Sequence, residues 1–223
     1  MTTKAKNRPF VTGHCVQLVF ALFMIACLVG TYWEEGLYWF QHHEYVLRTG
    51  TVIGPFSPIY GYGAAVFALF LGKGNDKRPI WKTYLYSCLI GGAAEFIMSL
   101  VAEYVFHQVI WDYNGMFLNI MGRTTVPFML GWGLGGLALM KLVYPLLTRL
   151  LSKVPYRIGQ PIFIALVIFM VINLFLTYGS LGRQAMRVAG DTEASNFLWA
   201  FFDRFYPDEW LMARFPAITV FAN

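Results

Sequence analysis

Charge is scarce in this sequence. Only 13% of its 223 residues are Asp, Glu, Lys or Arg, whereas 57% are hydrophobic and 18% are aromatic. Soluble globular domains typically carry about 25% charged residues. This balance excludes an ordinary soluble domain and indicates a chain that is solvated largely by lipid.

Motifs of several catalytic classes are missing too. No P-loop pattern, no G-x-S-x-G and no H-E-x-x-H occurs, so the chain is not predicted to hydrolyse ATP itself or to act as a hydrolase of those classes. Cys15, Cys27 and Cys88 lie in apolar runs without a C-x-x-C pair, and we expect neither a metal site nor a cofactor. The net charge of +5 is not taken as a sign of nucleic-acid binding, because the basic residues sort by membrane side.

Long uncharged runs dominate what is present. A helix needs about 20 mostly apolar residues to cross a bilayer. Five runs approach or exceed that length: 9–33, 49–72, 83–102, 124–140 and 158–182. The fourth continues past Lys141, whose amine we expect to extend toward the lipid headgroups. We predict an all-α polytopic bundle of five spanning helices over residues 1–190, with the first span retained rather than cleaved as a signal peptide.

Basic residues gather on alternate connections between these runs. The N-terminus, the second connection and the fourth connection hold Lys4, Lys6, Arg8, Lys73, Lys77, Arg78, Lys82, Arg149, Lys153 and Arg157. The first and third connections hold one each, Arg48 and Arg123. By the positive-inside rule the N-terminus is cytoplasmic and the C-terminus lies outside, in a multipass protein of the cell membrane.

Residues 191–223 form a separate amphipathic C-terminal segment in this interpretation. We predict a helix cap at Asp191 or Thr192. An apolar helical face follows, made of Phe197, Leu198, Phe201, Phe202 and Phe205. Such a helix could lie at the membrane interface, close over the outer mouth of the bundle, or simply pack on its neighbours.

The stretch "GPFSPIYGYGA" (54–64) places helix breakers inside an uncharged run. A helix over 59–71 alone would be about 20 Å long, whereas the hydrocarbon layer is about 30 Å thick. We therefore expect the breaker-rich segment to enter the outer leaflet as irregular backbone or as a broken helix. Irregular backbone is tolerated there only where protein or a wet cavity satisfies its polar groups. A kinked helix start with glycine faces for tight packing is the alternative.

Two carboxylates lie within the third run. Glu95 falls just past the bilayer middle and Glu103 about two turns further out. A charge at the centre of a membrane helix costs about 2.5–3.5 kcal/mol on insertion scales, so each marks either a functional site or a neutral carboxyl hydrogen-bonded across helices. Glu34 and Glu35, at the outer end of the first run, either face the same cavity or end a solvated helix.

The third connection reads "WDYNGMFLNIMGRTT". Trp111 and Tyr113 suit an aromatic belt, Asp112 and Asn114 are turn formers, and Asn119 and Gly122 lie just before the next run. Arg123 is the connection's only basic residue. It could pair with Glu95 or Glu103, clamp a phosphate or carboxylate, or contact a lipid headgroup.

Smaller signals concern packing. Gly131 and Gly135 suggest a small-residue face on the fourth helix, and Asn173 suggests an interhelical hydrogen bond.

Taken together, the Gly/Pro stretch, the Glu95 and Glu103 pair, and "WDYNGMFLNIMGR" resemble a bacterial multipass family described as "putative ABC-transporter type IV" permeases. The resemblance covers about 33–136, and the tail motif "YPDEWLMARFP" is similar to that family's C-terminal pattern. It implies a permease with an ATPase partner on the cytoplasmic side. The matching positions are Gly54, Pro55, Pro58, Tyr60, Gly61, Gly63, Glu95, Trp111, Asp112, Tyr113, Asn119, Gly122 and Arg123.

The leading hypothesis is a membrane transport component with an outward-facing polar pocket for a small or amphiphilic solute. Its predicted substrate-binding residues are Glu34, Gly54, Pro55, Pro58, Tyr60, Gly61, Glu95, Glu103, Trp111, Asp112, Tyr113, Asn119 and Arg123. An intramembrane enzyme acting on a lipid or lipid-linked substrate is the second, with Glu95 or Glu103 as general acid or base. A non-catalytic accessory or sensor subunit is the third. The expected partners are membrane lipids and a separate ATPase subunit.

Overall fold

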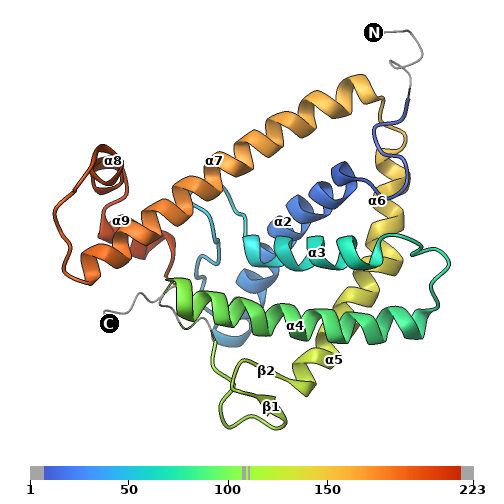
Figure 1. Ribbon diagram of the computed structural model, residues 1–223, viewed down its shortest axis with the longest axis horizontal. Coiled ribbons are helices and arrows are strands. Elements are labelled where there is room, and N and C mark those ends of the chain that lie inside the picture. The colour runs from blue at the N-terminus through green and yellow to red at the C-terminus, as the bar shows by residue number, and fades with distance from the viewer. Residues whose placement is uncertain (1–7, 107–108, 110, 217–223) are drawn as a thin grey trace.

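The protein is a helical bundle with one small β-hairpin (Figure 1). The computed structural model describes residues 8–106, 109 and 111–216. In chain order its elements are α2 (Val16–His42), α3 (Pro58–Leu71), α4 (Ile80–Phe106), β1 (Asn119–Ile120), β2 (Thr124–Thr125), α5 (Val126–Ala138), η1 (Leu139–Val143), α6 (Tyr144–Leu151), α7 (Tyr156–Val188), α8 (Phe197–Phe205) and α9 (Asp208–Arg214).

The prediction of an all-α polytopic bundle is confirmed. Within the described residues, four helical stretches are long and apolar enough to cross a membrane: Val16–His42, Ile80–Tyr104, Val126–Leu151 and Tyr156–Val188. The fifth expected span is the short helix α3, which has 14 residues and begins at Pro58. At 1.5 Å per residue α3 measures about 21 Å, which is shorter than the hydrocarbon layer of about 30 Å. Residues 54–57 are non-helical and do not lengthen it.

Close glycine contacts hold α2 against α3. A Cβ added at Gly61 would collide with Cys27 and Phe23 of α2, and one added at Gly30 would collide with the Tyr60 ring. Gly61, expected to contribute to solute binding, therefore serves the packing of these two helices. Pro58 is buried at the first position of α3, where its missing N–H costs no helical hydrogen bond.

The α4–α5 pair also packs through glycine, but not through the predicted pair. An added Cβ at Gly131 or Gly135 would meet nothing within 4 Å, so the expected small-residue face is wrong. Gly133 lies against the Cys88 and Tyr84 side chains of α4 instead. At Gly136 an added Cβ would lie 2.5 Å from Ser87 Oγ.

A π-helical turn, η1, interrupts the span from α5 to α6 just before Pro145. Pro145 cannot donate a backbone hydrogen bond and its ring crowds the preceding turn, which favours the wider coil. Lys141 lies in this turn. Its Nζ donates to the carbonyl oxygens of Asn75 at 2.5 Å and Arg78 at 2.7 Å. Lys141 therefore binds the α3–α4 connection, and its extension toward the headgroups stays a prediction.

One end of the bundle collects the basic connections. The backbone N–H of Phe10 donates to Val154 O at 2.8 Å, and that of Tyr156 donates to Arg8 O at 3.0 Å. The N-terminal segment, the α3–α4 connection and the α6–α7 connection lie toward this end (Figure 1). The β-hairpin, α8 and α9 lie toward the other.

The C-terminal segment packs on the end of α7. Phe202 of α8 is fully buried against Gly179, whereas Phe197 is 87% exposed, so only part of the predicted apolar face contacts the chain. The helix cap expected at Asp191 or Thr192 is wrong. Asn196 caps α8, and its Oδ1 accepts from Trp199 N at 3.0 Å.

Candidate functional site

A cavity of about 210 Å³ lies between α2, α3, α4, α5 and the connection after α4. Its polar lining comes from five of the predicted site residues, together with one unpredicted ring. They are Glu34, Tyr60, Glu95, Trp111, Tyr113 and Trp132. Segments far apart in the sequence thus bring acidic and aromatic side chains to one hollow, and we name it the acidic cavity.

Glu95 is the most enclosed ionisable group of the acidic cavity. The residue is 7% exposed. Its Oε1 accepts from the Tyr113 hydroxyl at 2.9 Å, and its Oε2 accepts from Thr124 Oγ1 at 2.6 Å. Among the described residues Glu95 forms no ion pair within 4.0 Å. Neutral hydroxyls alone therefore satisfy this carboxyl.

Glu34 repeats the arrangement from α2. Its Oε1 accepts from the Tyr60 hydroxyl at 2.9 Å. Each acid of the acidic cavity is thus paired with a tyrosine from a different element. In the connection after α4, burial together with the hydrogen bond to Glu95 raises the pKa of Tyr113 above its ordinary value, so its hydroxyl stays protonated and remains a donor.

The β-hairpin fixes the position of the Glu95 partners. Strands β1 and β2 pair antiparallel, and Gly122 turns between them with a φ of +69° that favours glycine. Tyr113 N donates to Gly122 O at 2.8 Å, and the indole Nε1 of Trp111 donates to Arg123 O at 2.9 Å. The hairpin therefore fixes the backbone of Tyr113 and the side chain of Trp111.

Asp112 and Asn119 build this loop and do not line the acidic cavity. Asp112 Oδ1 accepts from Asn114 N at 2.8 Å, and Asn119 Oδ1 accepts from Gly122 N at 3.0 Å. The first contact confirms the predicted turn at Asp112 and Asn114. A direct contact with solute stays a prediction for Asp112 and Asn119.

Of the two ion pairs predicted for Arg123, the structure contains the one with Glu103. Its guanidinium forms an ion pair with Glu103 and donates to Ser99 Oγ at 3.1 Å. It does not pair with Glu95. Neither Arg123 nor Glu103 lines the acidic cavity, so this half-exposed pair ties the hairpin to α4 beside the site.

The breaker-rich segment before α3 lines a second, wider cavity of about 630 Å³. Gly54 and Pro55 contribute to it, together with Glu35 of α2 and Arg214 of α9. Glu35 is buried and accepts from the Tyr45 hydroxyl at 3.1 Å, which raises the pKa of Tyr45. The predicted site residues thus divide between two hollows, and Glu34 and Glu35 face different ones.

The backbone before Pro58 is non-helical and contacts α7, whereas 58–64 of the breaker-rich stretch belong to α3. Ile53 N donates to Asn173 Oδ1 at 3.0 Å, and Asn173 Nδ2 donates to Ile53 O at 2.8 Å. Val52 N donates to Thr177 Oγ1 at 3.0 Å. Asn173 therefore satisfies loop backbone, and its expected bond to another helix is wrong.

Arg214 was missed by the sequence analysis. From α9 it donates to Thr51 O at 2.9 Å and to Gly54 O at 2.6 Å. A lone arginine near the C-terminus gives no signal of this role, because 160 residues separate it from Gly54. Together with Asn173 and Thr177, Arg214 satisfies backbone polar groups of the irregular segment before α3.

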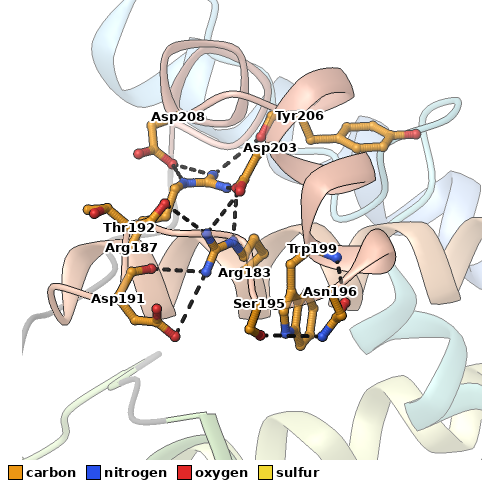
Figure 2. A network of polar contacts seen from close by, with 10 residues as sticks. All are labelled: Arg183, Arg187, Asp191, Thr192, Ser195, Asn196, Trp199, Asp203, Tyr206 and Asp208. Atoms are coloured by element: carbon orange, nitrogen blue, oxygen red, sulfur yellow. Dashed lines mark hydrogen bonds and ion pairs between the residues drawn. The ribbon is translucent and has the colours of Figure 1, made fainter.

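A charged network that the sequence analysis also missed joins α7 to α8 and α9 (Figure 2). Arg183 is fully buried; its Nε and Nη2 each lie 2.9 Å from an oxygen of Asp203. Arg187 lies 2.5 Å from both Asp203 and Asp208. The spacing of four residues between the two arginines, on one helix face, was the available signal.

Comparison with known families agrees with this architecture. No curated protein and no solved structure matches the chain. A family model described as "Putative ABC-transporter type IV" matches residues 21–178, which include every lining residue of the acidic cavity. The chain belongs to this family of ABC-transporter-related membrane proteins.

Proposed function

We propose that the protein is a membrane transport component that binds a small solute in the acidic cavity. Family membership supports an ABC-transporter-related role. The observation that carries the finer proposal is Glu95, a 7%-exposed carboxyl that faces a cavity and has no charged partner among the described residues. Ionisable groups inside membrane helices commonly mark substrate or ion pathways.

The side of the membrane follows from charge. The basic connections lie at one end of the bundle and the acidic cavity lies toward the hairpin at the other. With the basic end in the cytoplasm, the cavity opens on the outer side. A solute would then enter beside Trp111 and Tyr113.

The basic end also suits a partner ATPase. In the α3–α4 connection, Asn75 Nδ2 donates to Met140 O at 2.5 Å and Lys141 anchors two carbonyls of the same connection. A displacement of this connection would therefore also shift the π-helical turn and α5, the helix that carries Trp132 of the acidic cavity. No described contact favours the enzyme hypothesis. The guanidinium of Arg123, which would have to bind a phosphate, is already bound to Glu103 and Ser99.

The test is untargeted uptake. Proteoliposomes with the gently extracted protein, any copurifying ATPase and ATP are incubated with a small-molecule extract of the source cells, and mass spectrometry identifies what accumulates. We expect at least one solute to accumulate with wild type and to be lost with Glu95→Gln. Glu209→Gln, the same change on an exposed residue of α9, should keep uptake. Equal accumulation by wild type and Glu95→Gln would overturn the proposal.

A further inference from the structure

We infer that the solute of the acidic cavity is a small organic cation, an alkylammonium or similar amine. This inference rests on the proposed function and names the class of its substrate. Among the described residues, two carboxylates, five aromatic side chains and no basic side chain line the cavity. The carboxylates are those of Glu34 and Glu95, and the aromatic rings are Tyr60, Phe67, Trp111, Tyr113 and Trp132.

Uncompensated charge is the first argument. Glu34 and Glu95 accept hydrogen bonds only from uncharged hydroxyls, and neither forms an ion pair within the part of the chain that the structure describes. Two carboxylates that share one cavity repel each other and are poorly solvated there. A bound cation relieves both penalties. The nearby guanidinium of Arg123 is already engaged by Glu103, outside the lining.

The rings supply the second argument. A cation over the face of Trp or Tyr is stabilised by about 0.5–2 kcal/mol, most strongly when it is desolvated. The rings of Tyr60 and Tyr113, whose hydroxyls donate to the acids, also line the cavity, while the Tyr60 ring packs against Gly30 and the Tyr113 ring stacks on Phe128 with 4.9 Å between the ring centroids. A hydrated Ca²⁺ or Mg²⁺ ion would gain little from such rings and would require six or more oxygen ligands.

Size and lining narrow the class further. The volume of about 210 Å³ corresponds to roughly seven water molecules at about 30 Å³ each, below the range of about 300–1,000 Å³ for drug-sized sites. Val66, Phe67 and Met98 contribute apolar surface. This combination suits alkyl groups around one positive nitrogen. A zwitterion would bring a carboxylate that meets no basic side chain of the lining.

The experiment is calorimetric titration of the full-length purified protein in detergent with tetramethylammonium chloride at constant ionic strength. Tert-butanol, of similar shape and uncharged, is the matched ligand control. We expect tetramethylammonium to bind and tert-butanol not to bind. Glu95→Gln should weaken the cation's affinity by about tenfold or more. Trp132→Leu should weaken it by about two- to thirtyfold. Glu209→Gln should leave it unchanged.

Glu34→Gln is a second acid variant in case Glu95→Gln does not fold, since Glu34 is less buried. Size-exclusion profiles and thermal unfolding establish which variants are folded. Absent tetramethylammonium binding, or binding that folded Glu95→Gln, Glu34→Gln and Trp132→Leu retain, would overturn the cation assignment. The proposed function would still stand if Glu95→Gln abolished solute uptake, and would fail on its own if it did not.

Discussion

Glu95 is held by geometry rather than by an opposite charge. Hydrogen bonds to a charged group contribute about 1.5–3 kcal/mol each, and Tyr113 and Thr124 provide one to each carboxyl oxygen. Neither donor lies on α4; one comes from the loop and the other from β2. The position of the acid in the membrane could be predicted from the sequence, whereas its partners could not, because they depend on the hairpin fold.

Replacing Thr124 with valine tests this support. The change keeps the side-chain shape and removes the donor to Glu95 Oε2, leaving a buried acceptor unpaired. We expect thermal stability to fall by about 1–3 kcal/mol. Ser195→Ala, which alters a hydroxyl on an exposed residue, should change stability by less than about 0.5 kcal/mol. Equal melting temperatures for Thr124→Val and wild type would contradict the role of this contact.

The ion pairs of Asp203 predict that the C-terminal segment loses stability in acid. Hydrogen bonding from Arg183, followed by that from Arg187, holds the pKa of Asp203 below its usual value of about 3.9, against the opposing effect of burial. A depressed pKa means stabilisation that is complete above the unfolded pKa and is lost as the pH falls through the folded one. The network therefore stabilises the fold at neutral pH and weakens below about pH 4.

The measurement is the melting temperature of wild type and Asp203→Asn across pH 3–7. We expect wild type to be more stable at neutral pH, and the difference to shrink as the pH falls below about 4. A difference in melting temperature that stays constant over this range would mean that protonation of Asp203 does not change the stability of the protein.

At the scale of helices, α4 and α5 pack together through glycines, and the sequence could not show which glycine face of α5 turns toward α4. Periodicity places Gly131 and Gly135 on one helix face and Gly133 and Gly136 on the opposite face, and both faces are apolar and small. Which face turns to α4 depends on the hairpin that starts α5 and on the π-helical turn that ends it. The existence of the helix was predictable, but its rotation was not.

Two alanine variants separate these faces. Gly133→Ala should destabilise the protein by about 1–3 kcal/mol, because its methyl group collides with Cys88 and Tyr84. Gly135→Ala meets nothing within 4 Å and should be neutral, or stabilising by up to about 1 kcal/mol through helix propensity. Thermal unfolding in the same detergent gives both values. The reverse order of stabilities would contradict the observed packing.

The irregular segment before α3 is stabilised by polar side chains that reach it from other elements. Breakers and missing helix length predicted irregular backbone or a broken helix within 54–64, and the structure is non-helical at 54–57 and helical from Pro58. That Asn173, Thr177 and Arg214 would satisfy it could not be predicted, since more than 100 residues separate each from its partner.

Asn173→Leu removes both bonds to Ile53. Losing the two part-buried hydrogen bonds to the Ile53 backbone should cost about 0.5–1.5 kcal/mol each. We expect lower thermal stability and faster cleavage within 49–57 by an added protease. Val171→Leu, on an exposed position of the same helix, is the control and should behave as wild type. Unchanged cleavage in Asn173→Leu would show that these bonds do not hold the segment.

For the whole molecule, the central claim is that the acidic cavity binds a solute through Glu95. Native mass spectrometry of gently extracted wild type, Glu95→Gln and Glu209→Gln tests it most directly, because bound species are weighed with the intact chain. The account predicts a small-molecule adduct on wild type and Glu209→Gln that is absent from Glu95→Gln. Identical spectra for all three proteins would contradict it.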